Sequence, residues 1–99
     1  MEGYITETWN FRGYVSTYLE YYLKECGLNE NYTIADIHCG AFAEVMIRLL
    51  RHKKIETIEA KEFIQKCERY IGKTALEIGN ETAKELFDEF HKIWIQETK

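Results

Sequence analysis

The chain has 99 residues, of which 45% are hydrophobic and 30% charged, a composition typical of one folded domain and not of a disordered chain. Proline is absent and only 6 residues are glycine, so long helices are favoured over a turn-rich β fold. The formal net charge is -4, yet residues 48–73 hold eight Lys and Arg against four Glu, which places a basic middle between acidic ends.

The cysteines and the first residues indicate a cytoplasmic protein. Cys26, Cys39 and Cys67 form no CxxC pair, which argues against a disulfide framework and for a reducing compartment. The start, MEGYITETW, lacks the basic and apolar regions of a signal peptide, and no apolar run approaches the ~18 residues that span a bilayer. We therefore expect a soluble cytoplasmic protein that does not bind a membrane.

The first half of the chain predicts a short extended N-terminal arm followed by two helices. Apolar and tyrosine residues at helical spacing indicate a helix near 9–26, which Gly27 ends. Thr33 is a predicted N-cap, and the helix it begins covers about 33–53. Gly40 lies inside that helix, where glycine costs about 1 kcal/mol relative to alanine, and it indicates a kink or a close helix crossing.

The second half predicts two further helices. Thr57 is the expected cap of a helix near 58–71, and Thr74 of a helix near 74–97 that Gly79 could split in two. Short loops join these segments. The prediction for the whole chain is therefore one all-α domain, a compact bundle of about four helices.

The segment Arg48–Phe63, RLLRHKKIETIEAKEF, suggests a DNA-binding helix-turn-helix, because its loop has a suitable length. Against this, Glu59 and Glu62 stand where a recognition helix meets phosphates, and the turn has no glycine. The alternative is a helical hairpin whose charges complement the helix dipoles. The candidate nucleic-acid contacts are Arg48, Arg51, Lys53, Lys54, Lys61, Lys66 and Arg69.

The helix near 9–26 is rich in aromatic residues. Tyr14, Tyr18 and Tyr21 share one face, and Trp9 precedes them. Tyrosine and tryptophan are enriched in protein interfaces because they bury a large area and keep a polar group. We name these four residues as predicted anchors for a partner. A tyrosine-rich bundle core and a nucleotide-stacking surface are the alternatives.

The last predicted helix carries a row of acids. Glu81, Glu85 and Glu89 recur every four residues and so follow one side of the helix. Such a row either steers a basic partner or is simply solvated.

Catalytic and cofactor motifs are missing from the sequence. It has no Walker loop, no GxGxxG and no GxSxG, and its one serine is Ser16. Asp88-x-x-His91 fits half of a di-metal motif, but the paired Glu-x-x-His segments are missing. We predict no enzyme activity, no metal and no cofactor.

The expected function is that of a small intracellular interaction protein that inhibits or regulates a macromolecular partner. Viral (phage) anti-defence proteins, toxin immunity proteins and polymerase-binding regulators are of this kind, an analogy of size and composition alone. A protein partner and a homodimer are expected, because a bundle of this size can leave aromatics uncovered. The alternatives are a helix-turn-helix-like transcriptional regulator using residues 48–73 and a nucleotide-binding sponge.

Overall fold

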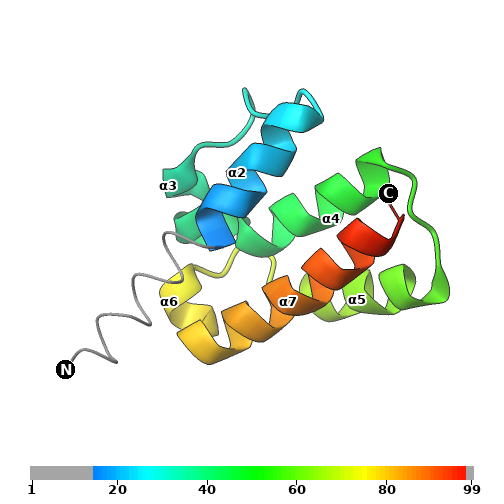
Figure 1. Ribbon diagram of the computed structural model, residues 1–99. Coiled ribbons are helices and arrows are strands. Elements are labelled where there is room, and N and C mark those ends of the chain that lie inside the picture. Colours follow the sequence, from blue (N-terminus) through cyan, green and yellow to red (C-terminus); the bar gives the residue numbers. More distant parts are fainter. Residues whose placement is uncertain (1–14, 98–99) are drawn as a thin grey trace, which may run out of the picture.

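Helix α4 (Phe42–His52) lies at the centre of the fold in the computed structural model, which describes residues 15–97 (Figure 1). An apolar surface this wide has to be covered by other helices. Seven of its 11 residues are buried: Phe42, Ala43, Val45, Met46, Ile47, Leu49 and Leu50. In chain order, the other elements are α2 (Ser16–Glu25), α3 (Ile34–Asp36), the π-helical turn η2 (Ile37–Ala41), α5 (Ile58–Glu68), α6 (Ala75–Ile78) and α7 (Asn80–Glu97).

Three long helices pack around α4. α2 covers one side of it, and α5 and α7 pack on the rest and on each other (Figure 1). The described residues contain helices and no strand, so the predicted all-α bundle is confirmed. The expected N-terminal arm falls outside the described residues. No helix in the described part of the chain is long and apolar enough to cross a membrane.

Side-chain caps confirm the predicted helix starts at Thr33, Thr57 and Thr74, whereas the start predicted near residue 9 lies outside the described residues. The Thr33 N–H donates to Asp36 Oδ2 at 2.8 Å, and the Asp36 N–H donates to Thr33 Oγ1 at 3.1 Å. Thr74 and Glu77 form the same reciprocal pair, at 2.9 and 3.1 Å. The Thr57 hydroxyl accepts the N–H three residues later. Each cap satisfies N–H groups that a helix start leaves unpaired, so short local patterns determine where these helices begin.

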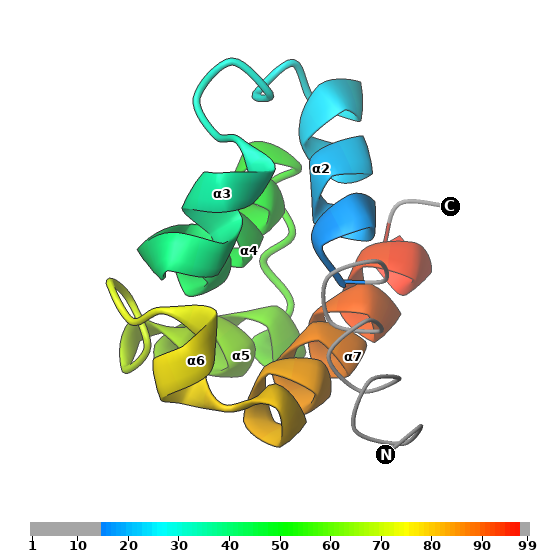
Figure 2. The same cartoon turned by 90° about the vertical axis from the view of Figure 1, so that its left-hand side faces the viewer.

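The helix predicted over 33–53 is not continuous, because the backbone leaves helical geometry at Cys39 and Gly40. Gly40 has φ of 124°, which a residue with a side chain rarely adopts. Its carbonyl oxygen accepts the Gly72 N–H at 3.2 Å, which joins η2 to the turn before α6. Figure 2 shows α3 and η2 directly above α6. Gly40 is thus both a kink and a point of close approach.

The loop between α4 and α5 is a helix C-cap that uses a lysine. Lys54 has φ of 57°, and its N–H donates to the Arg51 carbonyl at 3.1 Å. The Ile55 N–H donates to the Leu50 carbonyl at 3.1 Å, which completes a Schellman motif. Ile55 is 7% exposed and packs into the core. The turn that resembled a helix-turn-helix is therefore built by the end of α4, with Lys54 where glycine is usual.

Gly40 provides a test of this geometry. We expect Gly40→Ala to lower the free energy of unfolding by about 2–3 kcal/mol, because it forces a side chain into a strained conformation. The new Cβ would also lie 3.4 Å from the Gly72 oxygen. Gly27→Ala is the control, since Gly27 has φ of 72° and an added methyl group there would meet nothing within 4 Å, and it should cost about 1 kcal/mol. Urea unfolding followed by circular dichroism measures both, and equal costs would contradict the account.

Candidate functional site

Two tyrosines of α2 extend into solvent. Tyr18 is 39% exposed and Tyr21 is 55% exposed, and they lie one helical turn apart on the same side of the helix. A hydrogen bond to the neighbouring Glu25 carboxylate raises the pKa of Tyr21. The other two predicted anchors, Trp9 and Tyr14, lie outside the described residues.

Aromatic rings of α2 and α7 interlock beneath these tyrosines. The Tyr22 hydroxyl lies 2.8 Å from His91 Nε2, and the Tyr18 ring centre lies 5.1 Å from that of His91. The His91 ring stacks on Phe87 at 5.2 Å, and the Tyr22 ring lies 5.0 Å from Trp94. We call Tyr18, Tyr21 and the half-buried His91 the tyrosine face. Its exposed rings pack against buried aromatic rings, so they lose little conformational entropy when a partner binds.

His91 is held in its neutral form by its surroundings. Burial lowers its pKa below the usual value of 6.5, while the nearby Asp88 carboxylate acts in the opposite direction. A neutral imidazole carries a proton on one ring nitrogen only, so the tautomer determines whether Nε2 donates to the Tyr22 hydroxyl or accepts from it. Protonation would place a donor opposite that hydroxyl. That hydroxyl can accept the new hydrogen bond, but the half-buried ring would then carry a charge, so the stability of the fold depends on pH.

The acidic row of the last helix does not join the tyrosine face. Glu81 and Glu85 are exposed on α7, and at about 100° per residue Glu85 points roughly 160° away from Phe87, which packs against Tyr18. Glu89 instead pairs with Lys66 of α5, with 3.0 Å between Nζ and Oε2. The two described anchors, Tyr18 and Tyr21, and the predicted steering acids therefore occupy different surfaces.

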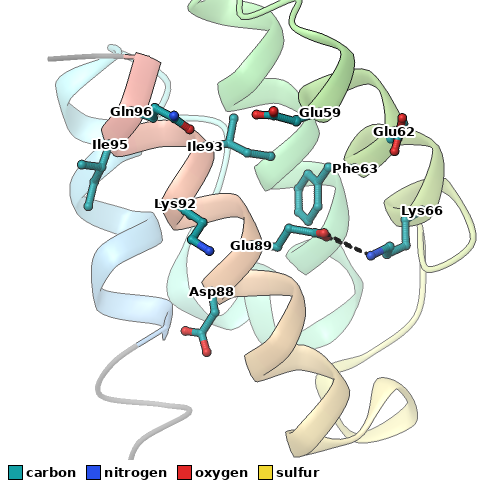
Figure 3. A pocket seen from close by; sticks show the side chains of 10 residues that line it. All are labelled: Glu59, Glu62, Phe63, Lys66, Asp88, Glu89, Lys92, Ile93, Ile95 and Gln96. Carbon is teal, nitrogen blue, oxygen red and sulfur yellow. Dashed lines mark hydrogen bonds and ion pairs between the residues drawn. The ribbon is translucent and has the colours of Figure 1, made fainter.

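A groove lies between α5 and α7, on the side of α7 that carries Glu89 (Figure 3). The Lys66–Glu89 ion pair crosses it, and the buried side chains of Phe63 and Ile93 contribute to its lining. We call it the acidic groove. Its lining residues are Glu59, Glu62, Phe63, Lys66, Asp88, Glu89, Lys92, Ile93, Ile95 and Gln96.

Sequence reasoning missed this groove. In the sequence, Glu59 and Glu62 stand out as acids at the start of α5 that argue against phosphate contact. Asp88 stands out as one of the acids of the last helix and as half of a metal motif. The apolar stripes of α5 and α7 indicate buried faces, but no pattern within one helix shows which other helix it meets. The groove therefore becomes visible only once α5 and α7 are side by side.

Three of the predicted nucleic-acid contacts have partners within the fold. The Arg48 guanidinium lies 5.8 Å from the centre of the Tyr32 ring, and Lys53 Nζ lies 6.0 Å from that of Trp94. Lys66 is in the ion pair with Glu89. The remaining candidates are exposed: Arg51, Lys54, Lys61 and Arg69. Lys61 and Lys66 diverge by about 140° around α5, so these two cations do not follow one stripe on that helix.

Arg48 belongs to a polar cluster that fastens the loop before α3 to α4. The Tyr32 hydroxyl donates a hydrogen bond to Glu44, and Arg48 stacks on the same ring. Burial raises the pKa of Tyr32 to about 12, and the Glu44 carboxylate acts in the same direction. A structural contact thus accounts for Arg48.

Among the side chains that the structure describes, no group of three or more His, Cys, Asp or Glu could hold a metal ion. Cys67 is fully buried, and burial raises its pKa to about 12, so it stays a thiol rather than a nucleophilic thiolate.

The pH dependence of stability tests the state of His91. Its pKa is lowered in the folded protein, so the unfolded chain binds more protons as pH falls through 6.5. We expect the free energy of unfolding to fall between about pH 7.5 and about pH 5.5, and His91→Gln to remove part of that loss. His52→Gln, which removes an exposed histidine, is the control. If His91→Gln leaves the pH profile unchanged, the neutral-histidine assignment is wrong.

Comparison of the chain with models of protein families, with curated proteins and with solved structures gave no match.

Proposed function

We propose that the protein is a non-enzymatic binding protein that inhibits or regulates a macromolecular partner through its tyrosine face. The observation that carries this proposal is the exposure of two neighbouring tyrosines, 39% and 55%, above a packed ring cluster. Tyrosine offers a large contact area at a low cost in conformational entropy. A rigid aromatic pair of this kind is typical of the few residues that dominate binding energy at an interface.

The chemistry of this face favours a protein partner. A site that stacks nucleotides or single strands usually sets cations beside its aromatic rings. On α2, Tyr18 and Tyr21 have Glu20 and Glu25 as neighbours and Lys24 as the one cation among residues 16–25. This arrangement gives little support to a nucleotide-binding sponge. The partners that Arg48, Lys53 and Lys66 have within the fold likewise give little support to a transcriptional regulator built on residues 48–73.

By analogy of size and composition, the proposed regulator is an anti-defence, immunity or polymerase-binding inhibitor. A cytoplasmic location is part of the proposal. It is supported by the three free cysteines, Cys26, Cys39 and Cys67, which form no disulfide with one another.

An affinity pull-down from the native host, quantified by mass spectrometry, tests the proposal. We expect a protein that is enriched by the wild-type chain to be lost with the double variant Tyr18→Ala/Tyr21→Ala, because the variant removes both aromatic anchors. Leu76→Ala is the matched control, since Leu76 is 90% exposed on α6, away from α2. Equal enrichment by the double variant and the control would sink the proposal.

Self-association is tested separately. A homodimer is the proposed assembly, supported by the tyrosine face, because a twofold contact uses the same patch on both copies. Light scattering after size-exclusion chromatography should then give twice the mass of one chain at micromolar concentration, and Tyr18→Ala/Tyr21→Ala should reduce it to one. A monomeric wild-type chain would contradict the dimer.

A further inference from the structure

The acidic groove is separate from the tyrosine face and has different chemistry. Glu89 and Ile93 line it on the side of α7 that meets α5 (Figure 3). His91 instead contacts Tyr18 and Tyr22 of α2. The lining of the groove combines apolar side chains, among them the 45% exposed Ile95, with six charged ones. Carboxylates outnumber ammonium groups by four to two, so the groove attracts cations. The carboxylates are those of Glu59, Glu62, Asp88 and Glu89, and the ammonium groups are those of Lys66 and Lys92.

We propose that the acidic groove binds a basic amphipathic helix of a partner protein. The lining residues of α5 run from Glu59 to Lys66, about 11 Å or two helical turns. The valley between two packed helices accepts a third helix, whose side chains pack into it. Apolar residues of the incoming helix would meet Ile95 and the aliphatic parts of the lining, and its lysines and arginines would meet the carboxylates.

The charges of the groove are largely unmatched within the fold. Among residues 15–97, Glu89 forms an ion pair with Lys66. Glu59, Glu62 and Asp88 form no ion pair within the same described residues. Three carboxylates are thus available to a basic helix without breaking any existing ion pair. Complementary charge of this kind selects a basic segment over an acidic one and accelerates its encounter.

Lys66 occupies the position that a cation of the partner would take. Its Nζ lies 3.2 and 3.0 Å from the two Glu89 oxygens, and the two side chains are 51% and 42% exposed. An exposed pair of this kind contributes little to stability, so an incoming lysine or arginine can displace Lys66 at low cost. Lys66 therefore competes with the partner for Glu89.

The two halves of this ion pair give a test that a structural role cannot imitate. Lys66→Gln removes the competitor and should tighten binding about threefold, whereas Glu89→Gln removes the acceptor and should weaken it about threefold. If the pair served only to hold α5 against α7, both variants would change the affinity for the peptide in the same direction, because each one breaks the same contact.

The probe is a synthetic helical peptide of ~14 residues with leucine on one face and lysine on the other. Fluorescence anisotropy at about 0.15 M salt, where long-range attraction is screened, measures its dissociation constant. Glu62→Lys/Asp88→Lys changes one groove acid on each helix and should weaken binding at least about tenfold. Glu30→Lys/Glu68→Lys makes the same change in net charge outside the groove lining and is the matched control.

The proposal is supported if the groove variant loses affinity, the control does not, and the two ion-pair variants shift in opposite directions. It is overturned if the peptide does not bind, if both double variants weaken equally, or if Lys66→Gln and Glu89→Gln shift the same way. Circular dichroism checks that each variant is folded. For a groove variant that fails this check, Glu62→Gln/Asp88→Asn replaces it under the same criteria.

Discussion

Helix α4 is buried on almost every side, and the other helices are arranged so as to cover it. Its exposed residues form a narrow polar strip that includes Arg48 and Arg51, and the remainder must be covered. Burying one large apolar side chain contributes about 1.5–3 kcal/mol, against about 0–1 kcal/mol for an exposed ion pair. The covering helices α2, α5 and α7 are therefore held in place by what they bury. Their outer faces can vary in composition without loss of the fold.

This arrangement gives α7 two different neighbours and two different contacts. Toward α2 the contact is aromatic, with the Tyr22–His91 hydrogen bond inside it, and it responds to pH. Toward α5 the core contact is capped at the surface by the Lys66–Glu89 ion pair, which responds to salt. One helix thus presents an aromatic surface on one side and an acidic one on the other. These surfaces are independent candidates for recognition, because no single residue belongs to both.

Local signals in the sequence predicted the helices well. Thr33, Thr57 and Thr74 each start a helix through side-chain caps that involve residues only three positions away. Gly40 was predicted to be a kink or a crossing, and it is both. The prediction of a continuous helix through it was wrong, since helical periodicity persists in the sequence even where φ of 124° interrupts the backbone. The left-handed conformation of Lys54 could not be predicted, because lysine has no preference for it.

Contacts between distant residues were beyond such reasoning. Tyr22 and His91 are separated by 69 positions and Lys66 and Glu89 by 23, and only the packing of helices brings them together. The charge of Arg48 and Lys53 suggested phosphate contacts, but each lies over an aromatic ring of another segment. Tyr18 and Tyr21 are exposed in the fold, whereas Tyr22 between them and the core is buried. The helical period alone could not show which of these tyrosines is exposed, because it does not show where α7 lies.

Amide hydrogen exchange in the native protein tests most directly whether α4 holds the fold together. If it does, the amides of buried residues such as Val45, Met46 and Leu49 exchange only through global unfolding. Their exchange free energies will then equal the free energy of unfolding from denaturant, and those at the ends of α2 and α5 will be smaller. Exchange of the α4 amides through local opening, faster than in α2 or α7, would contradict a fold organised around this helix.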